Sequence, residues 1–192
     1  MGGTSRSSTD YEFVTVWRVA GTLEEVRDVL GDAASLGRWW PAVYLNVTTL
    51  TPGNPDGTGK VLDLFTKGWL PYTLRWKLTV AEPITTHGFA ITAAGDLNGT
   101  GRWTFEKDGP EVVIRYDWNV GVAKPLLRRL SWLLKPAFSA NHRWAMARGQ
   151  ESLALELRRR RAGTDPGRVP KPPGPTFAQL ARLARRSGQK SR

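Results

Sequence analysis

The sequence contains no cysteine and only two histidines, which excludes several kinds of site at once. Without cysteine there is no disulfide framework and no thiolate for metal binding or nucleophilic chemistry, and this fits a reducing compartment. Two histidines without cysteine also give no ligand spacing of the kind that zinc sites use. We therefore expect neither a metal site nor a cofactor.

Long apolar runs are absent as well. No stretch approaches the roughly 18 apolar residues that a membrane-spanning helix needs. The first ten residues are small and polar, and no apolar run of the secretory type follows them. We therefore expect a cytoplasmic protein.

Positive charge is plentiful, but it is unevenly distributed. Residues 1–157 contain 17 Lys or Arg and 16 Asp or Glu, whereas residues 158–192 contain 11 basic residues and one acidic residue. A nearly neutral body lacks the broad basic face that phosphate binding requires, which argues against nucleic-acid binding by the body. The basic C-terminal part, 158–192, predicts a solubilising extension or a peripheral contact with an anionic membrane; binding to nucleic acid and binding to a partner protein are further alternatives.

The chain is long enough for one domain with a tail. We expect a flexible N-terminus over residues 1–9 and a single ligand-binding domain over residues 10–161. Residues 162–192 are predicted to be a proline- and glycine-rich linker that ends in a basic tail, because this composition cannot build a core.

One strand and two short helices are predicted before residue 43. Tyr11 to Ala20 alternates with the two-residue period of a strand. Thr22 and Glu25 form the capping box of a first helix that ends near Gly31. Asp32 is positioned to cap a second short helix, which a proline ends after Trp39 and Trp40.

The two-residue period then continues for nearly eighty residues, with turn signals between the segments. Six further strands are predicted near 43–51, 59–67, 71–82, 87–97, 99–107 and 111–121. Helical spacing returns at Pro125, and we expect Pro136 to break or kink that helix. A long helix follows, with an apolar stripe that includes Phe138, His142 and Met146.

The element order and several local sequences resemble one known superfamily. These sequences are Trp39-Trp40-Pro41, Leu70-Pro71-Tyr72, the segment from Gly95 to Trp103, Tyr116-Asp117-Trp118 and Asn141-His142-Arg143-Trp144. Over residues 10–160 the chain resembles the START-related helix-grip (SRPBCC) superfamily, in its polyketide cyclase/dehydrase-like and lipid-transport branch. The resemblance implies an α+β helix-grip fold: a curved antiparallel sheet of about seven strands around a long C-terminal helix, with two short helices after the first strand.

The same resemblance implies a cavity between the sheet and the long helix that holds a largely apolar molecule. Strand alternation predicts which side chains face it, and the opposite helix adds four more. The predicted ligand-binding residues are Leu64, Leu74, Trp76, Phe89, Ile91, Trp103, Phe105, Tyr116, Trp118, Asn141, His142, Ala145 and Met146.

Charged strand residues, among them Asp63, Arg102 and Asp117, alternate onto the outer face unless a β-bulge inverts a strand. His142 and Tyr116 are thus the candidate catalytic residues. No acidic residue lies one helical turn from His142, which favours a histidine held by Asn141 or a strand carbonyl over a general base.

The sequence therefore predicts a carrier or sensor of a hydrophobic small molecule, such as a lipid or a polyketide. A cyclase, aromatase or dehydratase that uses the same cavity is the alternative. A third possibility is an interaction protein that is recruited through its basic tail.

Overall fold

The computed structural model describes residues 10–122, 131–163 and 169–176, with the backbone alone from 131 to 135. Seven antiparallel strands form one sheet in the order β1-β7-β6-β5-β4-β3-β2. The strands are β1 (Asp10–Ala20), β2 (Tyr44–Thr51), β3 (Val61–Lys67), β4 (Thr73–Val80), β5 (Gly88–Gly95), β6 (Leu97–Asp108) and β7 (Glu111–Val122). All seven predicted strands are confirmed, within about two residues at each end.

Two short helical segments follow β1. Helix α1 (Leu23–Leu30) begins with the predicted capping box, in which the Glu25 amide donates to the Thr22 hydroxyl and the Thr22 amide donates to the Glu25 carboxylate. A 3-10 turn, η1 (Ala33–Ser35), then leads into α2 (Leu36–Trp39). The Asp32 side chain makes no capping hydrogen bond; its main-chain carbonyl instead accepts a hydrogen bond from the Ser35 hydroxyl at 2.9 Å.

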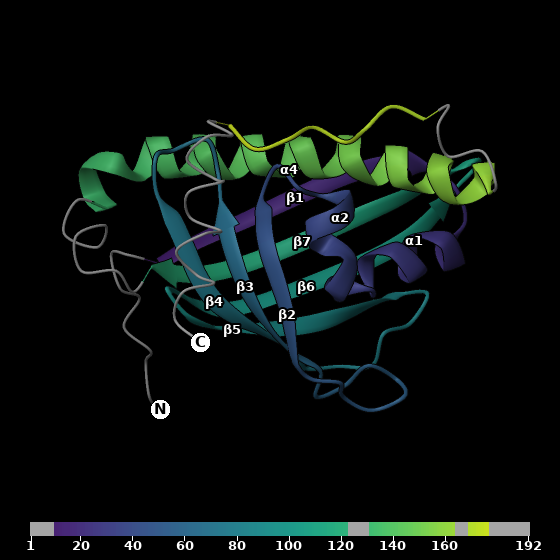
Figure 1. The fold of residues 1–192 in the computed structure, drawn as a ribbon, viewed down its shortest axis with the longest axis horizontal. Coiled ribbons are helices and arrows are strands. Elements are labelled where there is room, and N and C mark those ends of the chain that lie inside the picture. Colours follow the sequence, from purple (N-terminus) through teal and green to yellow (C-terminus); the bar gives the residue numbers. More distant parts are fainter. Residues whose placement is uncertain (1–9, 123–130, 164–168, 177–192) are drawn as a thin grey trace.

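A long helix, α4 (Ser131–Ala162), lies across the sheet (Figure 1). Pro136 does not break the helix, which continues through it. Pro136 lies in the second turn, so its missing amide removes one hydrogen bond near a helix end rather than in the middle. The helical spacing that the sequence shows from Pro125 to residue 130 lies outside the described residues.

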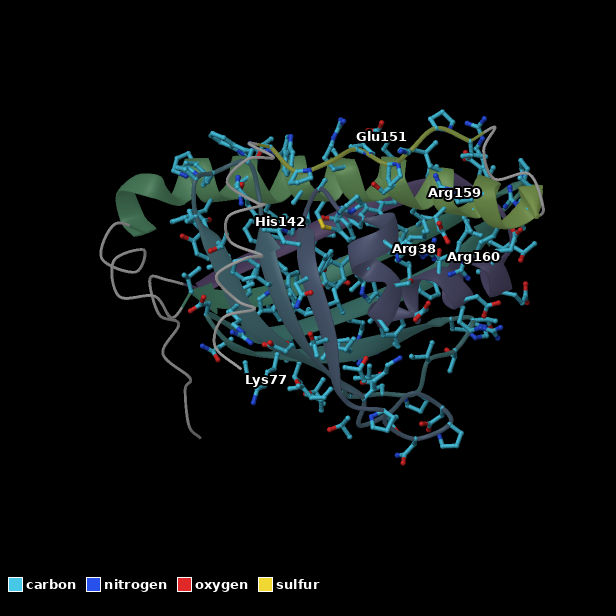
Figure 2. All side chains as sticks on the ribbon, viewed as in Figure 1. Arg38, Lys77, His142, Glu151, Arg159 and Arg160 are labelled. Atoms are coloured by element: carbon cyan, nitrogen blue, oxygen red, sulfur yellow. The ribbon has the colours of Figure 1, made fainter. Side chains whose placement is uncertain are left out.

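Buried charges attach the C-terminal half of α4 to the short helices. The Glu156 carboxylate is almost fully buried, and Arg38 of α2 donates two hydrogen bonds of 2.8 Å to it. Arg160 and Arg159 contact the same carboxylate at 3.0 and 3.3 Å. Figure 2 shows Arg38, Arg159 and Arg160 near the C-terminal end of α4. Burial alone would raise the pKa of Glu156, but hydrogen bonds from Arg38 and Arg160 outweigh it and lower the pKa.

Arg161 makes a second attachment. Its guanidinium donates to both carboxylate oxygens of Glu25 at 2.7 Å and to the carbonyl of Ala20 at 2.9 Å. The hydrogen bonds from Arg161 lower the pKa of Glu25 to about 2. Arg159, Arg160 and Arg161 thus have carboxylate partners on α1 and α4, although the sequence alone assigned them to the basic C-terminal part.

The strand register keeps one face of the sheet polar. Within the described strands, irregularities occur in β2, and the pairing of β6 with β7 is continuous from Leu97 to Asp108. Arg102 and Asp117 therefore stay on the outer face, as alternation predicts, and Asp117 pairs with Arg115 at 2.7 Å. None of the helices in the described part of the chain is long and apolar enough to cross a membrane.

Residues 169–176 return along α4. Figure 1 shows this yellow segment running beside the helix, from its C-terminal end back toward the turn between β3 and β4. Arg159 donates a hydrogen bond of 2.9 Å to the carbonyl of Pro170. At the other end, the hydroxyl of Thr176 contacts Lys67 and the carbonyl of Gly68.

Candidate functional site

A cavity of about 180 Å³ lies between the concave face of the sheet and the helices α2 and α4. Most of the predicted ligand-binding residues line it: Leu74, Trp76, Phe89, Ile91, Trp103, Tyr116, Trp118, Asn141, His142, Ala145 and Met146. Leu64 and Phe105 are fully buried but do not reach the cavity. Phe105 packs edge-on against Phe89, with the ring centroids 6.2 Å apart, and so belongs to the core behind the wall.

A stack of aromatic rings forms one wall of the cavity. Tyr116 lies between Trp103 and Trp118, with centroid distances of 4.0 and 5.7 Å and nearly parallel rings. Gly101 sits opposite Trp118 on the neighbouring strand. A Cβ at Gly101 would lie 2.5 Å from the Tyr116 hydroxyl and 2.9 Å from the Trp118 ring. The stack therefore depends on the absence of a side chain at this position.

A second aromatic group joins the sheet to the helices. Trp40, at the end of α2, packs against Trp17 and Tyr44 with centroid distances of 5.5 and 5.2 Å. The indole of Trp40 also lies so close to Gly149 of α4 that a Cβ there would overlap it. Because Gly149 has no side chain, the long helix can approach Trp40 closely.

All four tyrosines of the chain line this cavity. Tyr44 and Tyr116 are close enough to interact electrostatically, and Tyr11 and Tyr72 form a second pair that flanks Phe138, each 6.0 Å from it by ring centroid. Burial raises the pKa of Tyr72 to about 12 and the pKa values of the other three as well. At neutral pH the four hydroxyls are therefore uncharged groups that donate or accept hydrogen bonds.

His142 points from α4 toward β1 (Figure 2). Its ring stacks on Phe13, with a centroid distance of 4.0 Å, and its Nε2 lies 3.4 Å from the Thr15 hydroxyl. Burial, assisted by the positive charge of Arg143, lowers the pKa of His142 to about 4. The partner is thus a strand hydroxyl, rather than Asn141 or a strand carbonyl, and the ring is neutral at physiological pH.

Polar groups gather at the turn between β3 and β4. The Asn141 side-chain oxygen accepts a hydrogen bond of 3.2 Å from the Leu70 amide. Lys67 is buried, and its ammonium group donates to the carbonyls of Gly68 and Leu70 and to the Thr176 hydroxyl. Burial lowers the pKa of Lys67. We call residues 67–72 the rim, because Lys67, Gly68 and Tyr72 of this segment line the cavity.

The described lining includes no aspartate or glutamate. Its titratable groups are the neutral His142, four protonated tyrosines and Lys67, whose ammonium group is engaged by the rim and by Thr176. Acid–base catalysis usually needs a group with a pKa near the working pH, and His142 has a pKa about 4 without a carboxylate to orient it. The arrangement can bind an uncharged molecule by apolar contact and by a few hydrogen bonds.

No group of three or more potential metal ligands occurs among the residues that the structure describes. His87, the second histidine of the chain, is exposed on the loop before β5. Within the described part of the chain, neither His87 nor His142 belongs to such a group of potential metal ligands.

Several lining residues were not predicted from the sequence. They are Tyr11, Phe13, Trp40, Tyr44, Thr66, Lys67 and Tyr72, among others. Tyr11 and Phe13 lie on one face of β1 by the same alternation that places Trp76. The sequence does not indicate that this face of β1 borders the cavity. Tyr72 lies on the same alternating face as Leu74 and Trp76, whereas Lys67 is buried next to Thr66 at the end of β3, where the alternation stops.

Comparison with known proteins agrees with this architecture. The ZhuI aromatase/cyclase from Streptomyces sp. R1128 superimposes with a TM-score of 0.61 at 17% identity, covering 80% of this chain and 98% of that one. The protein TTHA0849 from Thermus thermophilus gives 0.59 at 14% identity, covering 81% and 99%. The di-domain aromatase/cyclase StfQ of the steffimycin pathway gives 0.59 at 17% identity, covering 82% and 53%. These likenesses show the fold.

A comparison with curated proteins found no significant match. The sequence model of one family, described as polyketide cyclase/dehydrase and lipid transport, matches residues 11–158. This match covers β1 to the C-terminal turns of α4, and the predicted resemblance is confirmed. The chain therefore belongs to the polyketide cyclase/dehydrase and lipid transport family.

Proposed function

We propose that this protein binds an uncharged, largely aromatic or alicyclic small molecule and holds it unchanged, as a carrier or sensor. The observation that carries the proposal is the cavity itself, which is lined by aromatic rings, by a histidine and tyrosines that are neutral at pH 7, and by the Lys67 ammonium, which the rim and Thr176 already engage. Burying a charge without a partner is costly, so such a lining favours neutral ligands.

The size of the cavity narrows the ligand class. A cavity of roughly 150 Å³ that is lined by apolar side chains takes up benzene. The cavity here measures about 180 Å³. It suits a ligand of one or two rings in the form described, and a longer ligand requires the rim to move.

Catalysis by a cyclase, aromatase or dehydratase is the alternative. It would use His142 or Tyr116 as acid or base. The low pKa of His142 and the high pKa of Tyr116 favour hydrogen-bonding roles for both side chains. The resemblance in fold to an aromatase/cyclase does not decide between the two functions, because one scaffold supports several.

A matched pair of probes tests the proposal. 2-Naphthol is neutral at pH 7 and naphthalene-2-sulfonate is its anionic counterpart, and binding to the full-length protein is followed by tryptophan fluorescence. Trp40, Trp76, Trp103 and Trp118 line the cavity and report on it. We expect saturable binding of 2-naphthol with one site and binding of the sulfonate at least tenfold weaker. Equal affinity for the two probes would contradict selection for neutral ligands.

A cavity-filling variant locates the binding. Ala145 lines the cavity, whereas Ala147 is exposed on the same helix. We expect Ala145→Phe to abolish 2-naphthol binding and Ala147→Phe to leave it unchanged, with both variants folded by circular dichroism. Retained binding in Ala145→Phe would place the ligand elsewhere. Extraction of any compound that co-purifies, with mass spectrometry, would then identify the natural ligand.

A further inference from the structure

The segment 169–176, which we call the strap, makes hydrogen bonds near both of its ends. Near its start the carbonyl of Pro170 accepts a hydrogen bond from Arg159, close to the C-terminus of α4. At its end the Thr176 hydroxyl accepts a hydrogen bond from Lys67 at 3.2 Å and donates one to the Gly68 carbonyl at 3.3 Å. The strap thus connects the far end of α4 to the rim of the cavity.

The composition of the strap suits this role. Pro170, Pro172, Pro173 and Pro175 make up half of its eight residues. Proline fixes its own φ and lowers the conformational entropy of the free chain, so a proline-rich segment loses little freedom when it docks. At about 3.1 Å per residue, an extended segment from Pro170 to Thr176 spans roughly 19 Å. Two contacts at the ends of such a stiff spacer can therefore hold it along the helix.

The contact at Thr176 is coupled to the rim by shared groups. The Lys67 ammonium that binds Thr176 also binds the carbonyls of Gly68 and Leu70. The Leu70 amide donates a hydrogen bond to the Asn141 side chain of α4. The Leu70 carbonyl accepts a hydrogen bond of 2.9 Å from the Tyr72 amide. The strap, the rim and α4 therefore form one hydrogen-bonded unit beside the cavity.

We propose that the strap is a latch that holds the rim closed and so controls how fast a ligand enters and leaves the cavity. Release of Thr176 removes one acceptor from the Lys67 ammonium and one donor from the Gly68 carbonyl, which still accepts a hydrogen bond from Lys67. The rim is then held to α4 by the hydrogen bond between Leu70 and Asn141 and by the packing of Tyr72 against Phe138. The proposal concerns regulation of the cavity and rests on the proposed binding function for its effect on ligands, whereas the effect on the rim stands without it.

Two substitutions at one position test the latch in the full-length protein. Thr176→Val removes the hydroxyl and keeps the shape of the side chain, and Thr176→Ser keeps the hydroxyl as a matched control. Amide hydrogen exchange over residues 67–72 is measured without ligand. We expect exchange about fivefold faster in Thr176→Val than in the wild type, because one net hydrogen bond corresponds to about that factor. Thr176→Ser is expected to behave as the wild type.

Stopped-flow tryptophan fluorescence with 2-naphthol then measures entry and exit. We expect both rate constants to rise about fivefold in Thr176→Val, with the dissociation constant changed less than twofold, because a latch alters the path and not the bound state. Equal hydrogen exchange in the Val and Ser variants overturns the latch, and so do unchanged rate constants with faster exchange. If 2-naphthol binds none of the proteins, the binding proposal fails, and hydrogen exchange alone decides whether the strap holds the rim.

Discussion

His142 shows how a residue that is often associated with catalysis is used here in packing. Its ring lies flat on Phe13 and contacts the hydroxyl of Thr15. Because burial disfavours the protonated ring, the pKa is lowered from its ordinary value of 6.5 to about 4. Above pH 6.5 the imidazole is therefore neutral in both the folded protein and the unfolded chain, and between pH 6.5 and 4 it is neutral only in the folded protein.

This shift predicts a pH dependence of stability. Above pH 6.5 the ring is neutral in the folded and the unfolded protein, so its titration does not change the free energy of unfolding. As the pH falls from 6.5 toward 4, the unfolded chain binds a proton that the folded protein rejects, so stability is lost in this window. From the pKa of about 4 we expect a loss of about 2–3 kcal/mol between pH 7 and pH 4.5. Urea unfolding at these two pH values measures it.

The control for this prediction is His142→Gln, which does not titrate. We expect its stability to fall over the same interval by about 2 kcal/mol less than that of the wild type. Parallel losses in the two proteins would show that His142 is protonated freely in the fold.

Gly101 is the residue on which the aromatic stack depends. Gly101→Ala places a Cβ 2.5 Å from the Tyr116 hydroxyl and 2.9 Å from Trp118, so the rings must shift. We expect a loss of about 1–3 kcal/mol in the free energy of unfolding, as for other overpacked cores, together with weaker 2-naphthol binding. Gly37→Ala is the matched control, because the nearest atom to a Cβ there is 3.6 Å away. Equal effects of the two substitutions would contradict this account.

The helix α4 is the element on which the whole cavity depends, and Glu156 is its buried attachment. Removing the charge in Glu156→Gln leaves Arg38, Arg159 and Arg160 around a neutral side chain. Because the buried acceptor loses its charge while its arginine partners are partly exposed, we expect a loss of about 2 kcal/mol. Glu151→Gln is the control, since Glu151 lies on the same helix with nearly half of its side chain exposed and pairs with Arg148. That change is expected to cost less than about 1 kcal/mol.

Chemical denaturation of both variants measures the difference. A cost for Glu156→Gln as small as that for Glu151→Gln would mean that the arginines are satisfied by solvent and that α4 is held by apolar packing alone.

At the scale of elements, the strands could be predicted because each has one buried and one exposed face. Trp76, Leu78 and Val80 are buried, and Arg75 and Lys77 on either side of Trp76 are exposed. The sequence was less informative at helix ends. Asp32 has the right residue type for a cap, but the backbone there bends into a 3-10 turn and the Ser35 side chain takes the available carbonyl. Pro136 is tolerated because it lies close to the start of α4.

The cavity was only partly predictable because part of its lining depends on contacts between distant segments. Tyr11 and Tyr72 meet at Phe138, and no local pattern relates these three positions. The position of residues 169–176 along α4 was unpredictable for the same reason, because a proline-rich composition indicates stiffness but not where a segment packs. The sequence also did not show that Arg159–Arg161 pair with carboxylates of α1 and α4. Membrane contact through residues 158–192 stays a prediction.

For the molecule as a whole, ligand binding should appear as global stabilisation, because the cavity wall combines strands from the whole sheet with α2 and α4. A ligand that binds only the folded protein adds about 2.7 kcal/mol at a concentration of 100 times its dissociation constant. For a chain of this size that corresponds to a rise of roughly 5–10 °C in Tm. We expect 2-naphthol to give this shift in differential scanning calorimetry.

Naphthalene-2-sulfonate at the same concentration is expected to raise Tm by at most about half as much, because its affinity is at least tenfold lower. A shift with the anionic probe alone would indicate binding to basic surface residues, and it would contradict the neutral cavity as the preferred site.

The pairing of β1 with β7 has a consequence for synthesis of the protein. Asp10 pairs with Gly121 and Ala20 with Glu111, so the first strand leaves the ribosome about a hundred residues before its neighbour in the sheet. At roughly 5–20 residues per second, it waits for several seconds or longer. During that time β1 exposes Tyr11, Trp17 and Val19, which are buried in the finished protein, together with Val14 and Val16, which stay exposed. In a nascent chain these apolar side chains therefore stay without their partner strand until β7 emerges, and the sheet closes only then.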